Sequence, residues 1–198
     1  MRWWQALRQA YPNRSALTLA IAALVVCMVV GGGFVIAADA TLHATSTESF
    51  CGTSCHEMQS TVAAEFKGTI HDKNRTGVRA TCADCHLPKE LVPMMVRKVK
   101  AAREVWGHFT GVINTKEKYD KHRYAMAVNE WTRMKGNNSQ ECRNCHDLAK
   151  ADPEKQSETA RARHAKALAE RTDCIDCHFG IAHTEPDGPG PKELKIAR

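Results

Sequence analysis

Near its start the chain carries an uninterrupted apolar stretch, residues 16–38, without a single charged side chain. As a helix, this stretch would span about 34 Å, enough to cross the hydrocarbon layer of a bilayer. Arg2, Arg8 and Arg14 precede it, so the positive-inside rule predicts a cytoplasmic N-terminus and an extracytoplasmic remainder. The alternative is a cleaved signal peptide, because residues 38–40 resemble a cleavage site. The apolar core of a signal peptide is usually about 7–15 residues, which favours a retained anchor.

After the apolar stretch, shorter amphipathic segments follow. The spacing of apolar residues predicts helices over 57–70, 93–112 and 115–135. The helix at 93–112 combines an apolar stripe with basic residues, so its apolar face is expected to pack on haem, and the helix could at the same time lie on a membrane surface. Asp152 followed by Pro153 predicts the start of a further helix that ends near residue 169. The Pro- and Gly-rich segment 184–198 is expected to be a flexible tail.

Eight of the nine cysteines fall into four short motifs that each end in histidine. The motif residues are Cys51, Cys55 and His56; Cys82, Cys85 and His86; Cys142, Cys145 and His146; Cys174, Cys177 and His178. The pattern C-x-x-C-H is the attachment signature of c-type haem, in which two thiols bind the porphyrin and the histidine binds its iron. A zinc ribbon or disulfides would not explain a histidine after every second cysteine. The first motif has three residues between its thiols, which would still share one face of a helix.

The motifs fall into two pairs, because His56 and His86 are 30 residues apart and His146 and His178 are 32 apart. This spacing predicts two di-haem halves. We therefore expect a mainly α protein with a cytoplasmic N-terminus (1–15), a transmembrane anchor (16–38), a periplasmic tetrahaem cytochrome c domain (39–183) and the tail. The domain has few apolar runs, so the haems are expected to form its core.

The formal net charge of +6 describes the polypeptide without cofactors. Four haems would add about eight propionates and about four ferric charges, leaving the holoprotein near +2. The basic composition therefore gives no reason to expect nucleic-acid binding.

Iron ligands on the second face of each haem must come from outside the motifs. His71 and His164 occupy matching places in the two halves, and His183 follows His178 closely, so these three are expected to be distal ligands. His108 is a weaker candidate, and His43 and His122 are not expected to bind iron. Met58, two residues after His56, is either an iron ligand or a packing residue.

These motifs together resemble the NapC/NirT family of membrane-anchored tetrahaem quinol dehydrogenases, with the NapC branch most similar. The resemblance rests on the single anchor, the segments 50–58, 69–82, 102–106 and 130–134, and the run from Cys174 to His183. It covers nearly the whole chain.

The resemblance implies that His71 binds the third iron and His183 the second, and that Met58 binds the first, as in NrfH-like members. It also implies a quinol site at Glu104, with Lys98 or Arg97 as the basic partner. Two departures stand out: the longer first motif, and Lys89 where many members have histidine.

The implied function is oxidation of membrane quinol and transfer of electrons to a periplasmic reductase, with nitrate reductase as the expected partner and the inner membrane as the location. One alternative is a quinone reductase that takes electrons from periplasmic multihaem cytochromes. Another is an anchored electron carrier without a quinone site. A homodimer stays open.

Overall fold

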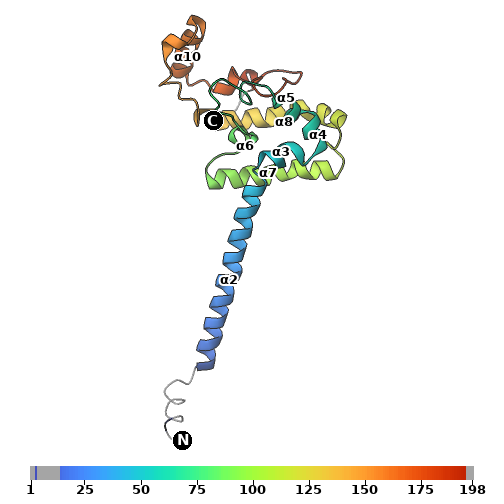
Figure 1. Cartoon of the computed structure of the whole chain (residues 1–198), viewed down its shortest axis with the longest axis vertical. Coiled ribbons are helices and arrows are strands. Elements are labelled where there is room, and N and C mark those ends of the chain that lie inside the picture. Colours follow the sequence, from blue (N-terminus) through green and yellow to red (C-terminus); the bar gives the residue numbers. More distant parts are fainter. Residues whose placement is uncertain (1–2, 4–13, 195–198) are drawn as a thin grey trace. The chain divides into compact units, whose positions relative to one another are not determined.

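The computed structural model describes residue 3 and residues 14–194 (Figure 1). The described residues divide into two units between Thr45 and Ser46. The first unit is the helix α2 (Arg14–Ala44). Its segment Ala16–Ala44 is the one helix in the described part that is long and apolar enough to cross a membrane. The helix continues past residue 38 to Ala44, and in this part Asp39 and His43 form an exposed i,i+4 pair (3.6 Å) and the Thr41 hydroxyl donates to the carbonyl of Ala37 (2.7 Å). Arg2 and Arg8, on which the orientation prediction rests, lie outside the described residues.

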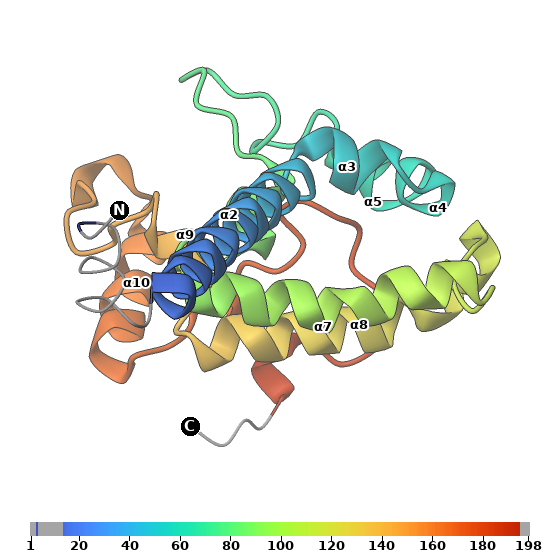
Figure 2. The ribbon, with the colours of Figure 1, turned by 90° about the horizontal axis from the view of Figure 1, so that it is seen from below.

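The second unit is helical, and its described residues contain no strand. Two long helices, α7 (Leu91–Phe109) and α8 (Lys116–Gly136), run in opposite directions and are joined by a short loop (Figures 1 and 2). The remaining elements are α3 (Glu48–Thr53), α4 (His56–Ser60), α5 (Val62–Phe66), α6 (Cys82–His86), α9 (Gln140–Arg143), α10 (Glu158–Glu170) and the 3₁₀ turns η1 (Pro153–Lys155), η2 (Cys174–Asp176) and η3 (Pro191–Glu193). The mainly α prediction is confirmed.

Local chemistry explains where the long helices begin. The side chain of Thr115 accepts a hydrogen bond from the backbone of Lys118 and caps α8. Helix α7 has Pro93 in its first turn, where the missing N–H would have no helical partner.

Two predicted helices are interrupted. The expected helix 57–70 breaks at Thr61, whose backbone leaves the helical region (ψ −108°) while its hydroxyl bonds the carbonyl of Glu57 (2.6 Å), giving α4 and α5. The expected helix from Asp152 is only the turn η1. Helix α10 starts separately, where Ser157 accepts a hydrogen bond from the backbone of Ala160.

The protein core is small. Trp131, Met134 and Ile175 form its buried centre, and Tyr124 and Phe179 are packed against it. Trp131 meets both of these rings edge-to-face, at centroid distances of 6.3 and 5.9 Å. So few buried apolar side chains are in keeping with the expectation that cofactors supply much of the interior.

The segment after Thr184 packs against α8 as far as the structure describes it, which corrects the expectation of a flexible tail for residues 184–194. Lys135 donates hydrogen bonds to the carbonyls of Pro191 (2.8 Å) and Leu194 (3.0 Å) and pairs with Asp176 (2.8 Å). Tyr124 bonds the carbonyl of Pro189 (3.1 Å). The bonded carbonyls lie more than 50 residues from Lys135 and Tyr124 in sequence, so local composition could not predict the docking. Residues 195–198 lie outside the described part.

Lys135→Met should release this segment, because it leaves Asp176 without its buried cation and two carbonyls without their donor. Removing one partner of a buried ion pair costs about 3–5 kcal/mol. Hydrogen exchange at residues 190–194 should accelerate, whereas the exposed Lys192→Met in the same segment should change nothing. If hydrogen exchange at residues 190–194 were unchanged in Lys135→Met, Lys135 would not be what holds this segment on α8.

Candidate haem-iron sites

Three of the four motifs place their cysteines and histidine in one short helix or turn. The second motif is the whole of α6, and its start is fixed by a capping box between Thr81 and Asp84. Hydrogen bonds from Lys89 and Thr81 lower the pKa of Asp84 to about 2, so it stays charged. The third motif starts in α9 and the fourth in η2, and in each the N–H of the motif histidine donates to the carbonyl of the first cysteine, so that the motif forms one turn.

The first motif is divided between two helices. Cys51 lies in α3, which ends at Thr53, and α4 begins at His56. Cys55 between them has an extended backbone (φ −121°, ψ 128°). The expectation that both thiols share the face of one helix is therefore wrong, because the longer spacing is taken up by a helix break.

Consecutive motifs are neighbours in space. The thiols of Cys51 and Cys82 are hydrogen-bonded, which lowers the pKa of Cys51 to about 7, and those of Cys142 and Cys174 are hydrogen-bonded, which lowers the pKa of Cys174 to about 6. Helices α6 and α9 are in contact, which brings the second motif next to the third. The four motifs thus follow one another in space in the order in which they occur in the chain.

Three motif histidines each face a histidine from elsewhere in the chain. The ring centroids of His86 and His183 are 6.1 Å apart, those of His164 and His178 are 6.1 Å apart, and those of His71 and His146 are 6.2 Å apart. Two metal–nitrogen bonds of about 2 Å, plus about 1 Å from each nitrogen to its ring centre, give about 6 Å. Each pair is therefore spaced to hold one iron between its rings.

The pairing links the two halves. His71 precedes the second motif but faces the histidine of the third, and His183 follows the fourth motif but faces the histidine of the second. Only the pair of His164 and His178 stays within one half. These partners are the ones implied for His71 and His183 by the family resemblance, and the ligand assignments stay predictions.

The histidines from outside the motifs are held by local contacts. His71 accepts a backbone hydrogen bond from Ala80 (3.0 Å) across a loop that Asn74 closes with bonds to the carbonyls of Ile70 and Val78. His164 Nδ1 is bonded to Gln156 Oε1 (2.6 Å).

The loop that carries His183 is tied to α5 and α8. The backbone N–H of Thr184 donates to Glu65 (2.8 Å), and Arg123 on α8 pairs with the same carboxylate. Burial lowers the pKa of His183 to about 4, so its imidazole is neutral at neutral pH, the form that binds metal.

The imidazole of His86 contacts the carboxylate of Glu130. Its Nδ1 lies 3.1 Å from Glu130 Oε1, and Glu130 also pairs with Arg133 (2.7 Å) and Arg97 (3.5 Å). Burial works against the charged form of His86, but Glu130 outweighs it and raises the pKa. Arg133 also bonds the carbonyl of Cys85 (3.1 Å) and pairs with Glu141, next to the third motif. The cluster of Glu130, Arg133 and Glu141 therefore connects the second motif to the third.

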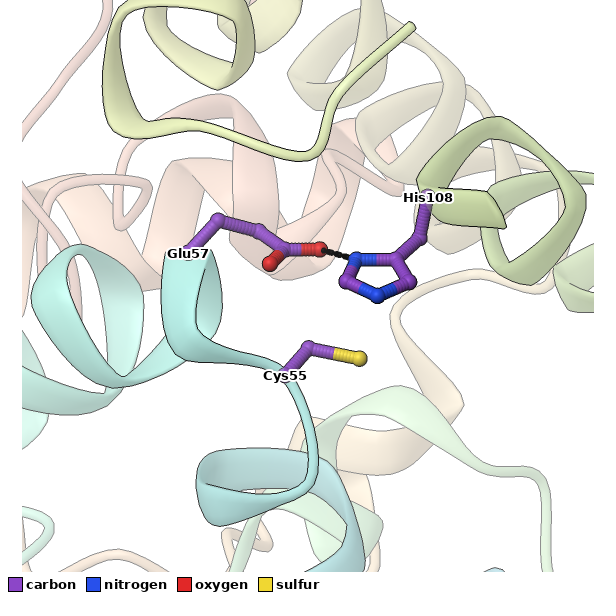
Figure 3. A group of neighbouring side chains, drawn as sticks. All are labelled: Cys55, Glu57 and His108. Carbon is purple, nitrogen blue, oxygen red and sulfur yellow. Dashed lines mark hydrogen bonds and ion pairs between the residues drawn. The ribbon is translucent and has the colours of Figure 1, made fainter. Parts of the chain in front are cut away.

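A second carboxylate lies at the first motif. Figure 3 shows Glu57 bonded to the imidazole of His108, with the thiol of Cys55 close by. Ligand atoms of these three side chains lie within 4.8 Å of one another. The ring centroids of His56 and His108 are 5.8 Å apart.

The expected quinol-site residues lie on α7. Arg97 and Lys98 both act electrostatically on the Cys51 thiol, so they lie beside the first motif, and burial lowers the pKa of Lys98. Glu104 is half exposed and lies 4.0 Å from Arg97. Arg97 is closer to Glu130 than to Glu104, a contact that sequence did not suggest.

The sequence patterns did not point to Glu57, Glu65, Glu130 or Arg133. The i,i+3 spacing of Glu130 and Arg133 was visible, but nothing local connects either residue to His86. The exposed His122 bonds its own helix at Lys118 (2.9 Å), and no ring partner is seen for it in the described part.

Comparison with known proteins points to the same family as the sequence motifs. The profile of the family described as "NapC/NirT cytochrome c family, N-terminal region" matches residues 13–188. The chain is 48% identical to the cytochrome c-type protein NapC of Escherichia coli K12 over 187 residues, covering 94% of this chain and 88% of that protein. It is 46% identical to the denitrification system component NirT of Stutzerimonas stutzeri over 182 residues, covering 92% and 88%. No solved structure matches the chain significantly.

Proposed function

Because the chain belongs to the NapC/NirT cytochrome c family, we propose that it binds four covalent haem c groups and passes electrons from membrane quinol to a periplasmic reductase. Membership of this family implies haem c and quinol-linked electron transfer. The number of haems, the quinol dehydrogenase activity and the periplasmic orientation are the parts that we propose. The one N-terminal apolar helix fits a membrane-anchored cytochrome. We take nitrate reductase as the partner from the likeness to NapC.

The observation that carries the proposal is the pairing of three motif histidines with His71, His164 and His183 at 6.1–6.2 Å. A zinc or disulfide reading of the cysteines gives no reason for such pairs. The neighbouring motifs support an electron path from the first to the fourth.

At the quinol end, the chain's own residues would handle protons and orientation. Bound haem would supply one-electron redox chemistry. Lys98 would donate a hydrogen bond to a quinol oxygen, since it lies beside the first motif. Glu104 is exposed enough to accept a proton and pass it to water, and it lies 4.0 Å from Arg97.

The direct test is to purify the full chain, measure the mass added by covalent haem, and reduce the protein with a quinol analogue in lipid vesicles. Four haems and inhibitor-sensitive reduction support the proposal. Fewer haems would contradict the tetrahaem assignment, and four haems without quinol-driven reduction would favour an anchored carrier.

Glu104→Ala tests the proton acceptor. General-base groups contribute roughly 100-fold or more, so quinol oxidation should slow by about 100-fold while haem content stays unchanged. Steady-state reduction with a quinol analogue measures the effect. The exposed carboxylate variant Glu193→Ala should keep the wild-type rate, and an unchanged rate in Glu104→Ala would remove Glu104 from the site.

A further inference from the structure

Glu57 is a carboxylate in the interior, with a side chain only 2% exposed. Its Oε1 accepts a hydrogen bond of 2.6 Å from His108 Nδ1. Its other oxygen is buried, without a hydrogen bond, and 3.7 Å from His56 Nδ1. A buried carboxylate is costly unless a partner compensates it, so the contact with His108 is what holds Glu57 in place.

This contact fixes which ring nitrogen of His108 carries the proton. When a carboxylate accepts from Nδ1, that nitrogen carries the proton, and Nε2 is left as a free donor atom for a metal. The arrangement of carboxylate, histidine and metal is widespread, because the carboxylate orients the ring and makes it a stronger ligand.

The free side of His108 is directed toward the first motif. The ring of His108, at the end of α7, lies near the Cys55 thiol (Figure 3). Its centroid is 5.8 Å from that of His56, close to the spacing in the other three pairs. His56 and Met58 are two residues apart in α4, about 200° around the helix, so they cannot both face one iron. His108 lies on the side of His56.

We propose that His108, oriented by Glu57, binds the iron of the first haem opposite His56, in place of Met58. The inference rests on the proposed haem content and deepens it. It also assigns a role to Glu57: a positioning residue that orients the ring of His108, makes it a stronger electron donor to the iron and lowers the potential of the first haem. A first haem with two histidine ligands would have a lower potential than one bound by methionine.

The test compares His108→Ala and Met58→Leu in the full-length protein. We expect His108→Ala to convert one of four low-spin irons to high-spin by electron paramagnetic resonance, and Met58→Leu to leave the spectrum unchanged. A sulfur-to-iron charge-transfer band that disappears in Met58→Leu would overturn the proposal, and so would a wild-type spectrum in His108→Ala.

Glu57→Gln is a second test if His108→Ala fails to fold. The amide keeps the size of the side chain but not its charge. The reduction equilibrium of one haem should shift at least tenfold toward the ferrous form, which is about 59 mV for a one-electron couple. The exposed Glu154→Gln serves as the control. No shift in Glu57→Gln would overturn the proposal.

The haem count separates this inference from the proposed function. Fewer than four haems in the wild-type protein would contradict the proposed function. Four haems with a sulfur ligand on the first iron would contradict only the assignment of His108.

Discussion

Replacing His183 with alanine should turn one low-spin haem into a high-spin, five-coordinate one and block electron flow beyond it. The ring of His183 lies 6.1 Å from that of His86, and no other described ring faces His86. Loss of a residue that only supports a metal ligand already costs about 10–100-fold, so loss of the ligand should slow electron transfer to the partner by at least about 100-fold. Electron paramagnetic resonance and stopped-flow reduction measure the two effects.

The loop should survive this substitution, because its anchors are backbone and neighbouring groups. Thr184 N–H still bonds Glu65, and Arg123 still holds that carboxylate. The exposed His122→Ala is the control and should leave all four irons low-spin. If His183→Ala kept four low-spin irons, the second iron would have a different distal ligand.

The motif residues could be predicted from sequence because haem attachment is local chemistry. Two thiols and a histidine must lie within a few residues to reach one porphyrin, so the pattern alone marks Cys82, Cys85 and His86. The long helices α7 and α8 were also predicted within a few residues, since their apolar periodicity is sustained.

The distal iron ligands could be predicted from the sequence only in part. Similar spacing suggested His71 and His164 together, but it could not show that His71 crosses to the third motif while His164 stays with the fourth. That difference depends on how the two halves pack, which no local pattern encodes. The implied partner of His71 came from the family resemblance.

The supporting carboxylates could not be predicted at all. Glu57 and Glu130 each look like ordinary charged residues on a helix, and charged residues are usually solvated. Their roles arise when helices distant in sequence bring them to His108 and His86. The break at Thr61 is similar, because nothing in the segment 57–70 shows that its helix must stop to leave α4 beside α8.

Glu130→Gln should raise the potential of the second haem. A carboxylate behind the Nδ1 of a ligating histidine makes the imidazole a stronger electron donor and stabilises ferric iron. Glu130 Oε1 lies 3.1 Å from His86 Nδ1, and the neutral amide keeps that contact but loses the charge. The equilibrium should shift at least tenfold toward ferrous iron, about 59 mV, and a spectroelectrochemical titration measures it.

Glu141→Gln tests whether the bond to His86 or the total charge of the cluster sets the potential of the second haem. Glu141 pairs with the same Arg133 and is buried, yet His86 is bonded to Glu130. Both variants remove one negative charge from the cluster and leave Arg133 with one carboxylate partner. If the bond to His86 sets the potential, Glu141→Gln should move the second haem much less than Glu130→Gln. Equal shifts in the two variants would mean that the charge of the cluster, and not its contact with the histidine, tunes this iron.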